Sequence, residues 1–298
     1  MKPKITVIIP AYNEAETIAD VIAKIRTLHP DFSIIVINDG SGDDTASKAL
    51  EAGAEVYSHP YNIGNGAAVK NGIRMAEADI LVFMDGDGQH NPDDIGLLLE
   101  QLGDYDMVVG ARSMTGHTSF TRAFGNRVYN WLASYVANFR IVDLTSGFRA
   151  VKADLAKEFI YLLPNTYSYP TTLTLGALRS GWSVKYVSIK MRKREKGKSN
   201  ISIVKDGARF FMIITKICTL FSPLRVFLPV SFSMFLMGVL YYFYTFITQG
   251  RFTNMSAVLL TNAVVIFMMG LVSEQISQMR SERRLRSRVK KESDQKEY

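Results

Sequence analysis

Short apolar runs alternate with helix-like segments through residues 1–190. In the first helical segment, Ile18, Val21, Ile22 and Ile25 fall on one face. Apolar strands that alternate with amphipathic helices are typical of an α/β sheet with crossover helices. The expected strands are KITVIIP, SIIVIN, AEVYS, ADILVFMD and YDMVVGAR, and the expected helices cover residues 13–29, 42–53, 64–78 and 91–102.

Two longer uncharged stretches follow towards the C-terminus, at residues 226–248 and about 255–273. At about 1.5 Å per residue, a helix of this length crosses a hydrocarbon core of roughly 30 Å. The short turn QGRFTNM separates the two stretches, so we expect a transmembrane helical hairpin. Two buried core helices are the alternative, although such helices are usually shorter.

The distribution of basic residues predicts the orientation of this hairpin. The turn contains only Arg251, whereas the positive-inside rule places the more basic flank in the cytoplasm. The N-terminus meets a charged residue too soon to form the apolar core of a signal peptide. We therefore expect an integral membrane protein with both termini in the cytoplasm. The basic residues after the second stretch are Arg280, Arg283, Arg284, Arg286, Arg288, Lys290 and Lys291.

Before the hairpin, the segment RFFMIITKICTLFSPLR mixes apolar residues with Arg209, Lys216 and Arg225. Such a pattern favours a helix that lies in the membrane interface, and an amphipathic helix on the soluble domain is the alternative. The expected organisation is a cytoplasmic domain at 1–205, an interfacial segment at 206–225, a membrane hairpin at 226–274 and a basic tail at 275–298.

Composition excludes several classes of protein. With 47% hydrophobic residues the chain is not disordered, and 35 Lys and Arg against 28 Asp and Glu give a net charge of +7. The single Cys218 excludes an internal disulfide and a cysteine-based metal cluster, and the four His have no ligand-like spacing. The basic run at 190–198 adjoins the expected interface, where it binds a phosphate ligand or only attracts anionic lipids. No nucleic-acid module accompanies it, so we expect no nucleic-acid partner.

Polar residues follow the expected strands, where ligands of doubly wound sheets gather. Tyr12 could cover the face of a base and Asp39 could accept hydrogen bonds from its edge, although each also suits a turn or helix cap. Gly64-Asn65-Gly66 could cradle a phosphate at a helix start, but Val69 replaces the third glycine of a dinucleotide fingerprint, which disfavours NAD. Lys70 reaches a phosphate or is a solvated surface charge.

The sequence Asp85-Gly86-Asp87-Gly88-Gln89 follows an apolar strand and brings two carboxylates together. Close carboxylates repel each other unless a cation lies near them. Oxygen ligands suit Mg²⁺ or Mn²⁺, which bridge the phosphates of substrates. The sequence therefore predicts a divalent metal site, with an acidic turn in water as the alternative.

Seven motifs in order give a specific resemblance: VIIPAYNE, NDGSGDDT, NIGNGAAVKNGI, FMDGDGQHNPDDI, GAR, DLTSGFRA and REKGKSN. Together they resemble inverting family-2 glycosyltransferases of the GT-A fold, and most closely the polyisoprenyl-phosphate glycosyltransferases such as dolichol-phosphate mannose synthase. The match covers about residues 4–205, and the membrane hairpin resembles that of the bacterial members. The resemblance implies a mixed, mostly parallel sheet, a nucleotide-sugar donor, a Mg²⁺ or Mn²⁺ ion and a polyprenyl-phosphate acceptor.

The resemblance also assigns residues. It implies that the nucleoside contacts Pro10, Tyr12, Glu14 and Asp39, and that Asp85, Asp87 and Gln89 serve the metal and the donor phosphates. It implies that the acceptor phosphate contacts Arg112, Arg122, Arg149, Arg194 and Ser199. Three departures affect the donor sugar and loop closure: Asn38 replaces an acid, Asn65 replaces a frequent Lys, and Asn200 follows Ser199 where many relatives have Lys.

We therefore expect an enzyme that transfers one sugar from a UDP- or GDP-sugar to polyprenyl phosphate. A glycosyltransferase acting on a lipid hydroxyl, such as diacylglycerol, is the nearest alternative, and it would need a carboxylate base. A polysaccharide synthase is disfavoured because there are two expected spans and no QxxRW motif. A non-catalytic scaffold or transporter subunit is the alternative from another class, but neither uncharged stretch has an ionisable residue for transport. The sugar, the base, the lipid length and the oligomeric state are open, and a homo-oligomer is compatible with the sequence.

Overall fold

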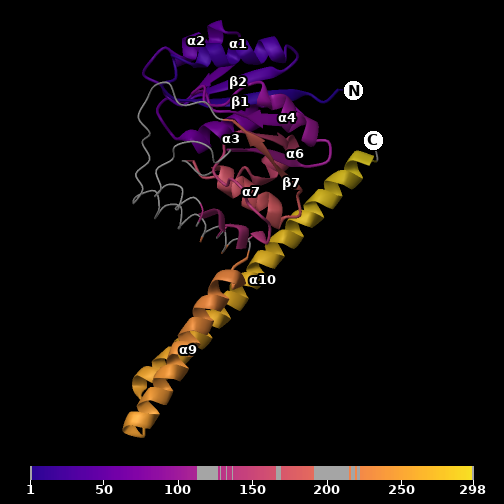
Figure 1. Cartoon of the computed structure of the whole chain (residues 1–298). Helices are drawn as coiled ribbons and strands as arrows, with labels where there is room; N and C mark the ends of the chain where they lie inside the picture. The colour runs from indigo at the N-terminus through magenta and orange to yellow at the C-terminus, as the bar shows by residue number, and fades with distance from the viewer. Residues whose placement is uncertain are drawn as a thin grey trace. The chain divides into compact units, whose positions relative to one another are not determined.

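The computed structural model describes residues 2–112, 127, 129–131, 133–135, 137–165, 169–190, 215, 219 and 222–296, and of residues 280–296 it describes the helical backbone alone. The chain divides into two compact units, Met1–Phe210 and Phe211–Tyr298. The first unit contains the sheet and its helices, and the second contains a pair of long helices (Figure 1).

Within the described residues, seven strands form one sheet in the order β3-β2-β1-β4-β6-β5-β7. The β6 strand is antiparallel to its neighbours β4 and β5, and the other pairings are parallel. The expected mixed, mostly parallel sheet is therefore confirmed. The strands are β1 (Ile5–Ala11), β2 (Ser33–Asn38), β3 (Glu55–Ser58), β4 (Ile80–Phe83), β5 (Met107–Arg112), β6 (Arg149–Lys152) and β7 (Val184–Ile189).

Helices cover both faces of the sheet because successive strand residues point to opposite sides. Val7 and Ile9 of β1 share a core with α1, α2 and α4. Ile8 between them points the other way and touches α3 at Gly72. The helices of this unit are α1 (Ile18–Leu28), α2 (Thr45–Glu51), α3 (Asn65–Met75), α4 (Asp94–Gln101), α6 (Ala153–Phe159) and α7 (Tyr169–Arg179).

The apolar face predicted for the first helix is confirmed, since Ile18, Val21, Ile22 and Ile25 are all buried. The helix nevertheless begins five residues later than expected. Residues 14–17 form a turn instead, in which the backbone N–H groups of Thr17 and Ile18 donate to the carbonyl oxygen of Glu14. The polar residues that follow β1 therefore lie in a loop.

The second unit is an antiparallel pair of helices, α9 (Leu224–Gln249) and α10 (Asn254–Lys296) (Figure 1). Among the described residues, two segments are long and apolar enough to cross a membrane: Leu224–Gln249, with a mean hydropathy of 1.8, and Asn254–Met279, with 2.2. Only 11% and 17% of their most apolar windows are buried, whereas core helices of a soluble protein are mostly buried. This exposure favours a membrane hairpin over the core-helix alternative.

The hairpin helices extend beyond the uncharged stretches. Arg225 lies in the first turn of α9, and Glu274 lies within α10. A carboxylate oxygen of Glu274 accepts a hydrogen bond of 3.1 Å from the backbone N–H of Leu224, the first residue of α9. The first N–H groups of a helix have no partner inside it, so Glu274 supplies one. The two uncharged stretches themselves contain no charged residue, and Arg225 and Glu274 lie where the helices extend beyond them.

Candidate active site

The loops after β1, β2 and β4 meet at one edge of the sheet because these strands are parallel neighbours. The backbone N–H of Asp39 donates to Ala11 O over 2.9 Å, and that of Met84 donates to Ile8 O over 3.2 Å. Both bonds continue the pairing to the point where the polar loops begin. The sequence motifs at the strand ends are thus brought to one edge of the fold.

The loop after β1 is tied to the loop after β2. The Asn13 backbone N–H donates to Ser41 Oγ over 3.0 Å, and the Glu14 N–H donates to Thr45 Oγ1 over 2.9 Å. Tyr12 is 47% exposed, so its ring is accessible to a ligand. Pro10 is buried within β1, opposite Ile37, so its side chain offers little surface to a ligand.

Asp39 is only 3% exposed, and its carboxylate contacts the protein itself. Its Oδ1 lies 2.6 Å from His59 Nδ1 and accepts the backbone N–H of Ile63 over 2.9 Å. Its Oδ2 accepts the N–H of Gly64 over 2.8 Å. Asp39 therefore anchors the turn that leads into α3, which agrees with the alternative interpretation of this residue as a turn or cap residue.

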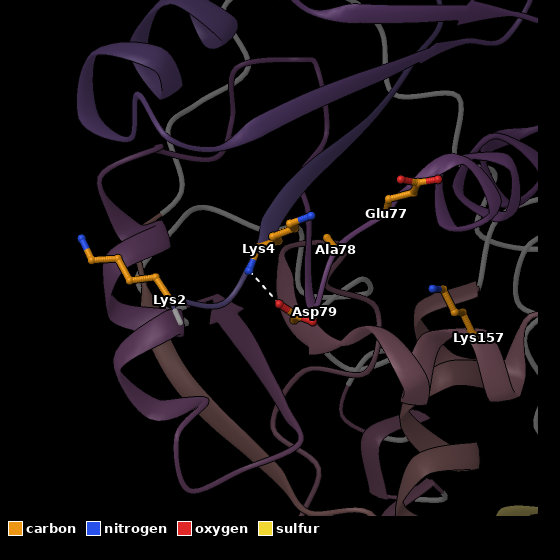
Figure 2. Close-up of a pocket in the computed structure, with 6 residues that line it drawn as sticks. All are labelled: Lys2, Lys4, Glu77, Ala78, Asp79 and Lys157. Atoms are coloured by element: carbon orange, nitrogen blue, oxygen red, sulfur yellow. Dashed lines mark hydrogen bonds between the residues drawn. The ribbon is translucent and has the colours of Figure 1, made fainter. Parts of the chain in front are cut away.

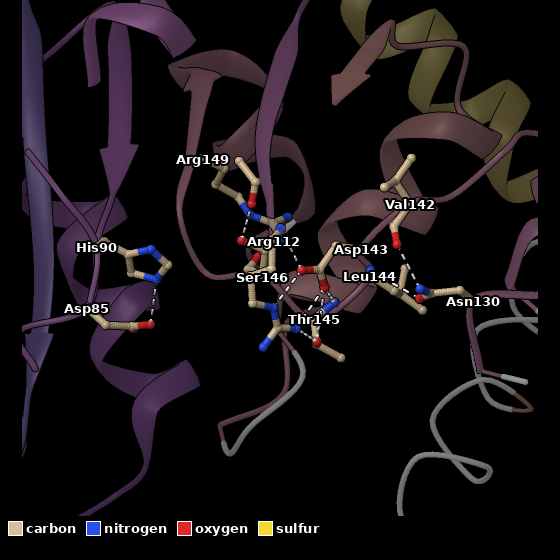
Figure 3. A network of polar contacts seen from close by, with 11 residues as sticks. Asp85, His90, Arg112, Asn130, Val142, Asp143, Leu144, Thr145, Ser146 and Arg149 are labelled. Carbon is tan, nitrogen blue, oxygen red and sulfur yellow. Dashed lines mark hydrogen bonds and ion pairs between the residues drawn. The ribbon is translucent and has the colours of Figure 1, made fainter. Parts of the chain in front are cut away.

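Asp85 lies at the end of β4 beside a buried imidazole (Figure 3). His90 Nε2 is 3.6 Å from Asp85 Oδ2, and the His90 ring stacks on Phe148 with centroids 5.1 Å apart. Burial raises the pKa of Asp85, but the hydrogen bond and charge of His90, a hydrogen bond from Asn65 and the charge of Arg112 together hold that pKa below its ordinary value. Asp85 is therefore ionised at neutral pH.

Asp87 and Gln89 continue the same loop. Asp87 Oδ1 accepts the backbone N–H of Gln89 over 3.1 Å, and Thr17 Oγ1 donates to Gly86 O over 2.7 Å. These bonds fix the loop against the start of α1. A Cβ at Gly147 would lie 3.1 Å from Asp85 Oδ2, so glycine leaves room beside that oxygen.

The residues around Asp85 fit a divalent cation. The described residues contain no group of three or more His, Cys, Asp or Glu that could hold a metal by themselves. Mg²⁺ sites commonly use one or two carboxylates and take further oxygens from substrate phosphates and water. Asn65 Oδ1 is buried with no hydrogen-bond partner among the described residues, and Asn65 contacts Asp85. Ionised carboxylates with a spare amide oxygen form a donor set that suits Mg²⁺ or Mn²⁺.

Arg112 and Asp143 form a bidentate ion pair at the end of β5 (Figure 3). Arg112 Nε donates to Asp143 Oδ2 over 2.6 Å, and its Nη2 donates to Asp143 Oδ1 over 2.8 Å and also to Thr145 Oγ1. The hydrogen bonds that Arg112 donates to Asp143 raise the pKa of Arg112 despite burial. Burial raises the pKa of Asp143, but the bonds and charge of Arg112 and backbone donors bring it below its ordinary value. The guanidinium is thus held in one orientation and stays partly exposed.

Arg149 lies in the interior with no exposed surface. Its guanidinium donates to Ser146 O, to Pro170 O over 3.1 Å and to Thr174 Oγ1 over 3.1 Å. Burial lowers its pKa, with partial compensation from nearby tyrosines and acids. Its Nε has no hydrogen-bond partner among the described residues, but a guanidinium with no exposed surface does not suit the expected contact between Arg149 and the acceptor phosphate.

Lys70 is half-buried on α3, and its ammonium donates to Asn165 Oδ1. Burial lowers its pKa, and the charge of Arg74 adds to this effect. The remaining residues expected at the acceptor, Arg122, Arg194 and Ser199, lie outside the described residues.

An open hollow of about 510 Å³, whose lining residues are drawn in Figure 2, is not part of this site. It lies beside the start of β1, where Lys4 N–H donates to an oxygen of Asp79 over 2.8 Å. The start of β1 is the opposite edge of the sheet from the loops described above. Its lining residues are Lys2, Lys4, Glu77, Ala78, Asp79 and Lys157.

The described residues between 127 and 137 are helical, and they and Phe139 expose a row of aromatic side chains. Trp131 is 66% exposed, and its ring stacks on that of the exposed Tyr135, with centroids 6.5 Å apart. Phe139 is also exposed, whereas Ala133 and Ala137 are buried. The two rings are four residues apart and so lie on one side of the helix.

Several residues at the site were missed from the sequence. His90 belongs to the motif DGDGQHNPDDI, and Asp143 belongs to the motif DLTSGFRA. Their place in these motifs could have identified them as site residues. Asn65 was noticed in the possible phosphate cradle Gly64-Asn65-Gly66 and as a departure from Lys, but its contact with Asp85 was not predicted. His59 had no signal, because the residues that it contacts are distant in sequence.

Comparisons with known proteins agree with this geometry. Residues 6–160 match the family described as glycosyl transferase family 2, and residues 222–279 match the GtrB C-terminal hairpin. An undecaprenyl-phosphate mannosyltransferase of Micrococcus luteus is 28% identical over 67% of this chain and 88% of its own length. A polyprenol monophosphomannose synthase of Mycolicibacterium smegmatis is 29% identical over 66% of this chain and 80% of its own length.

The match to a third relative also covers the hairpin region of this chain. The undecaprenyl-phosphate 4-deoxy-4-formamido-L-arabinose transferase of Pseudomonas fluorescens is 27% identical over 95% of this chain and 87% of its own length. Among solved structures, glucosyl-3-phosphoglycerate synthase of Mycobacterium tuberculosis, in complex with Mn²⁺, UDP and glucosyl-3-phosphoglycerate, matches with a TM-score of 0.57. It is 22% identical and covers 73% of this chain and 80% of its own. The expected GT-A fold is thereby confirmed.

Proposed function

The chain belongs to glycosyl transferase family 2, and we propose that it transfers one sugar from a UDP- or GDP-sugar to a polyprenyl phosphate, with inversion at the sugar carbon. One observation carries the proposal: an ionised carboxylate at a strand end, Asp85, and a C-terminal hairpin of two apolar helices occur in one chain. The relatives that act on undecaprenyl phosphate support the lipid-phosphate acceptor.

Asp85, Asp87 and Gln89 would hold a Mg²⁺ or Mn²⁺ ion, with Asn65 beside them. Such an ion supplies positive charge that stabilises a departing nucleoside diphosphate. The ionised state of Asp85 and the Mn²⁺ in the structural neighbour support this assignment. The start of α3 faces the same loop and offers backbone N–H groups to the donor phosphates.

The acceptor phosphate supplies its own nucleophile. A lipid phosphate is ionised at neutral pH, so one of its oxygens forms the bond to the sugar carbon without a general base. The bond from that carbon to the nucleoside diphosphate breaks, and its electron pair leaves with the diphosphate. The protein has to position the acceptor, and Arg suits phosphate geometry. We assign this role to Arg112, Arg122, Arg194 and Ser199, and we leave the buried Arg149 out of it.

Arg112 is suited to this task because Asp143 and Thr145 already fix its orientation. A guanidinium that is held before binding loses less conformational freedom when it contacts a phosphate. Arg112 lies between Asp143 and the Asp85 loop, and the charges of Asp143 and Asp85 both raise the pKa of Arg112. Arg112 would therefore provide a permanent positive charge beside the proposed leaving group.

The exposed row of Trp131, Tyr135 and Phe139 supports a membrane-borne acceptor. Tryptophan and tyrosine concentrate at membrane interfaces, where their rings lie at the headgroup level. Exposed Arg127 and Arg140 accompany this row and suit anionic headgroups. We infer that this face of the enzyme contacts the cytoplasmic leaflet, where the lipid phosphate arrives.

A panel experiment tests the function. The detergent-purified protein is incubated with UDP- and GDP-sugars, Mg²⁺ or Mn²⁺, and a polyprenyl phosphate, and glycolipids are detected by mass spectrometry. The proposal predicts a polyprenyl-phosphate monoglycoside from at least one donor. Transfer to diacylglycerol but not to the phosphate would favour the lipid-hydroxyl alternative. An absence of both transfer and donor hydrolysis would favour a non-catalytic scaffold.

A further inference from the structure

A buried imidazole connects the loop after β2 with helix α3. The backbone N–H of His59 donates to Asn38 O over 2.9 Å, which extends the pairing of β2 and β3 by one residue. This bond fixes the imidazole beside Asp39, and both residues are buried. His59 Nδ1 lies 2.6 Å from Asp39 Oδ1, and His59 Nε2 lies 2.7 Å from Asn71 Nδ2 on α3.

The hydrogen-bond directions assign the tautomer of His59. Arg74 Nη1 donates to Asn71 Oδ1 over 2.9 Å, and this bond orients the Asn71 amide with its nitrogen towards His59. The Asn71 amide nitrogen is a donor, so His59 Nε2 must accept. The ring proton is therefore on Nδ1, and it is donated to Asp39.

Asp39 connects His59 to the turn at the start of α3. It accepts the N–H of Ile63 and the N–H of Gly64, the residue that precedes the helix. Neighbouring backbone leaves no room for any other residue at Gly40: a Cβ there would lie 2.4 Å from the carbonyl carbon of Tyr61. The first residue of α3 is Asn65, which contacts Asp85. A chain of contacts thus runs from His59 through Asp39 to the Asp85 loop.

We propose that His59 is a positioning residue of the donor site: its Nδ1–H orients Asp39, and Asp39 sets the turn at 61–64 so that α3 presents its first N–H groups to the donor diphosphate. The inference rests on the proposed function for the identity of that ligand. It assigns His59 no contact with substrate. Disturbing the Nδ1–Asp39 bond weakens nucleotide binding, whereas losing the Asn71 contact alone does not.

Two substitutions separate the two ring nitrogens. His59→Asn places an amide nitrogen near the position of Nδ1 and keeps the donor to Asp39, but it loses the partner of Asn71. His59→Gln reaches the position of Nε2 and keeps the Asn71 contact, but it leaves Asp39 without a side-chain donor. A residue that only filled space would tolerate the larger Gln at least as well as Asn.

The first readout is amide hydrogen exchange of the full chain in detergent, without nucleotide, in peptides that cover residues 60–66. His59→Gln should accelerate exchange at Ile63 and Gly64 by roughly tenfold, and His59→Asn should stay within about threefold of wild type. Equal protection in all three proteins would overturn the positioning role. Equal loss in both variants would show that the ring itself, not its Nδ1–H, is required.

The second readout is calorimetric titration of UDP and GDP with Mg²⁺. The nucleotide that the wild type binds should bind His59→Gln about tenfold or more weakly and His59→Asn almost normally. Loss of protection without loss of affinity would disprove the link to the donor. If the wild type bound neither nucleotide, the proposed function would fail, and the exchange experiment would still decide whether His59 orients Asp39 and the turn.

Discussion

Three of the carboxylates around the candidate site, Asp39, Asp85 and Asp143, each have a side-chain nitrogen donor beside them. Asp39 is paired with an imidazole and two backbone N–H groups, and Asp143 with a guanidinium. Asp85 has an imidazole at 3.6 Å and an amide, and it is the most open of the three. The first two are therefore suited to holding protein groups in place, and Asp85 is suited to meeting a ligand.

The pair of Asp143 and Arg112 makes a pH-dependent contribution to stability. The folded protein lowers the pKa of Asp143, so the stabilisation is fully present above its ordinary value of 3.8 and is lost as the pH falls through the lower folded value. Asp143→Asn should destabilise the protein at pH 7 by about 1–3 kcal/mol, because Arg112 is partly exposed and can be rehydrated. Thermal unfolding in detergent measures this.

Asp104 is exposed, so Asp104→Asn serves as the matched control for that measurement. It should change the thermal stability little, both at pH 7 and below pH 3.8. The difference between wild type and Asp143→Asn should shrink as the pH is taken below 3.8. A difference that stays constant down to pH 3 would show that the ion pair is not its source.

The sequence predicted which residues carry the chemistry of the site, but it did not predict which residues they contact. The DGDGQ loop was predicted correctly at the end of a strand because an apolar run and a polar loop are both local patterns. The partners of the carboxylates could not be predicted in the same way. His59 is 20 residues from Asp39 and Asp143 is 31 residues from Arg112, and only the tertiary fold brings them together.

At the scale of elements, the position of α3 depends on close contact with the sheet. A Cβ at Gly72 would lie 2.3 Å from Ile8 Cγ2 in β1, which is far inside van der Waals contact. Gly72 therefore lets α3 approach the sheet, while Asp39 fixes the start of the same helix. Two separate contacts thus define where the N-terminus of α3 lies.

Two helical glycines test this packing. Gly72→Ala should lower the free energy of unfolding by about 1–2 kcal/mol, because overpacking outweighs the gain of up to about 1 kcal/mol in helix propensity. Gly96→Ala in α4 is the control, since a Cβ there meets nothing within 4 Å, and it should be neutral or stabilising. Thermal unfolding that showed the same shift for both variants would contradict the close contact.

The aromatic row at residues 131–139 makes a second prediction for an element. The chain has two tryptophans, of which Trp131 is 66% exposed, while Trp182 is 9% exposed and donates to Glu158 over 3.1 Å. In nanodiscs that contain brominated lipids, the fluorescence of Trp131 should be quenched. The variant Trp131→Phe, which keeps only Trp182, should show little quenching. Equal quenching of both proteins would refute the interfacial placement.

Strands and helices with strong periodicity were predicted well, and short or context-dependent ones were not. The buried face of α1 followed from its apolar spacing. The β6 strand has only four residues and is antiparallel to both neighbours, so its pairing could not be derived from the local pattern. The helix α10 extends to Lys296 and so includes most of the segment that was expected as a basic tail at 275–298.

At the scale of the whole molecule, the chain joins an enzymatic unit to a membrane hairpin. The hairpin helices are exposed along most of their apolar length, which a bilayer would cover. The basic residues lie in the C-terminal part of α10, and the turn between the helices has only Arg251. The charge difference predicts that both termini are cytoplasmic.

Cysteine labelling in intact cells checks this orientation. In a Cys218→Ser background, Phe252→Cys in the turn should react with a membrane-impermeant maleimide, and Tyr298→Cys should react only after permeabilisation. Phe252 is exposed in the structure, so its reactivity reports topology. Labelling of Tyr298→Cys from outside would reverse the predicted orientation.

The most direct test of the whole account is a competition between two acceptors in one reaction. Wild type and Asp87→Asn are each incubated with the active donor and with equal amounts of a polyprenyl phosphate and the polyprenol of the same length. The glycosylated products are identified and quantified by mass spectrometry. The account predicts that only the phosphate is glycosylated, and that Asp87→Asn or excess chelator lowers the yield by about a hundredfold or more, since several kcal/mol of transition-state stabilisation are lost. Glycosylation of the polyprenol, or full activity of Asp87→Asn in excess chelator, would contradict it.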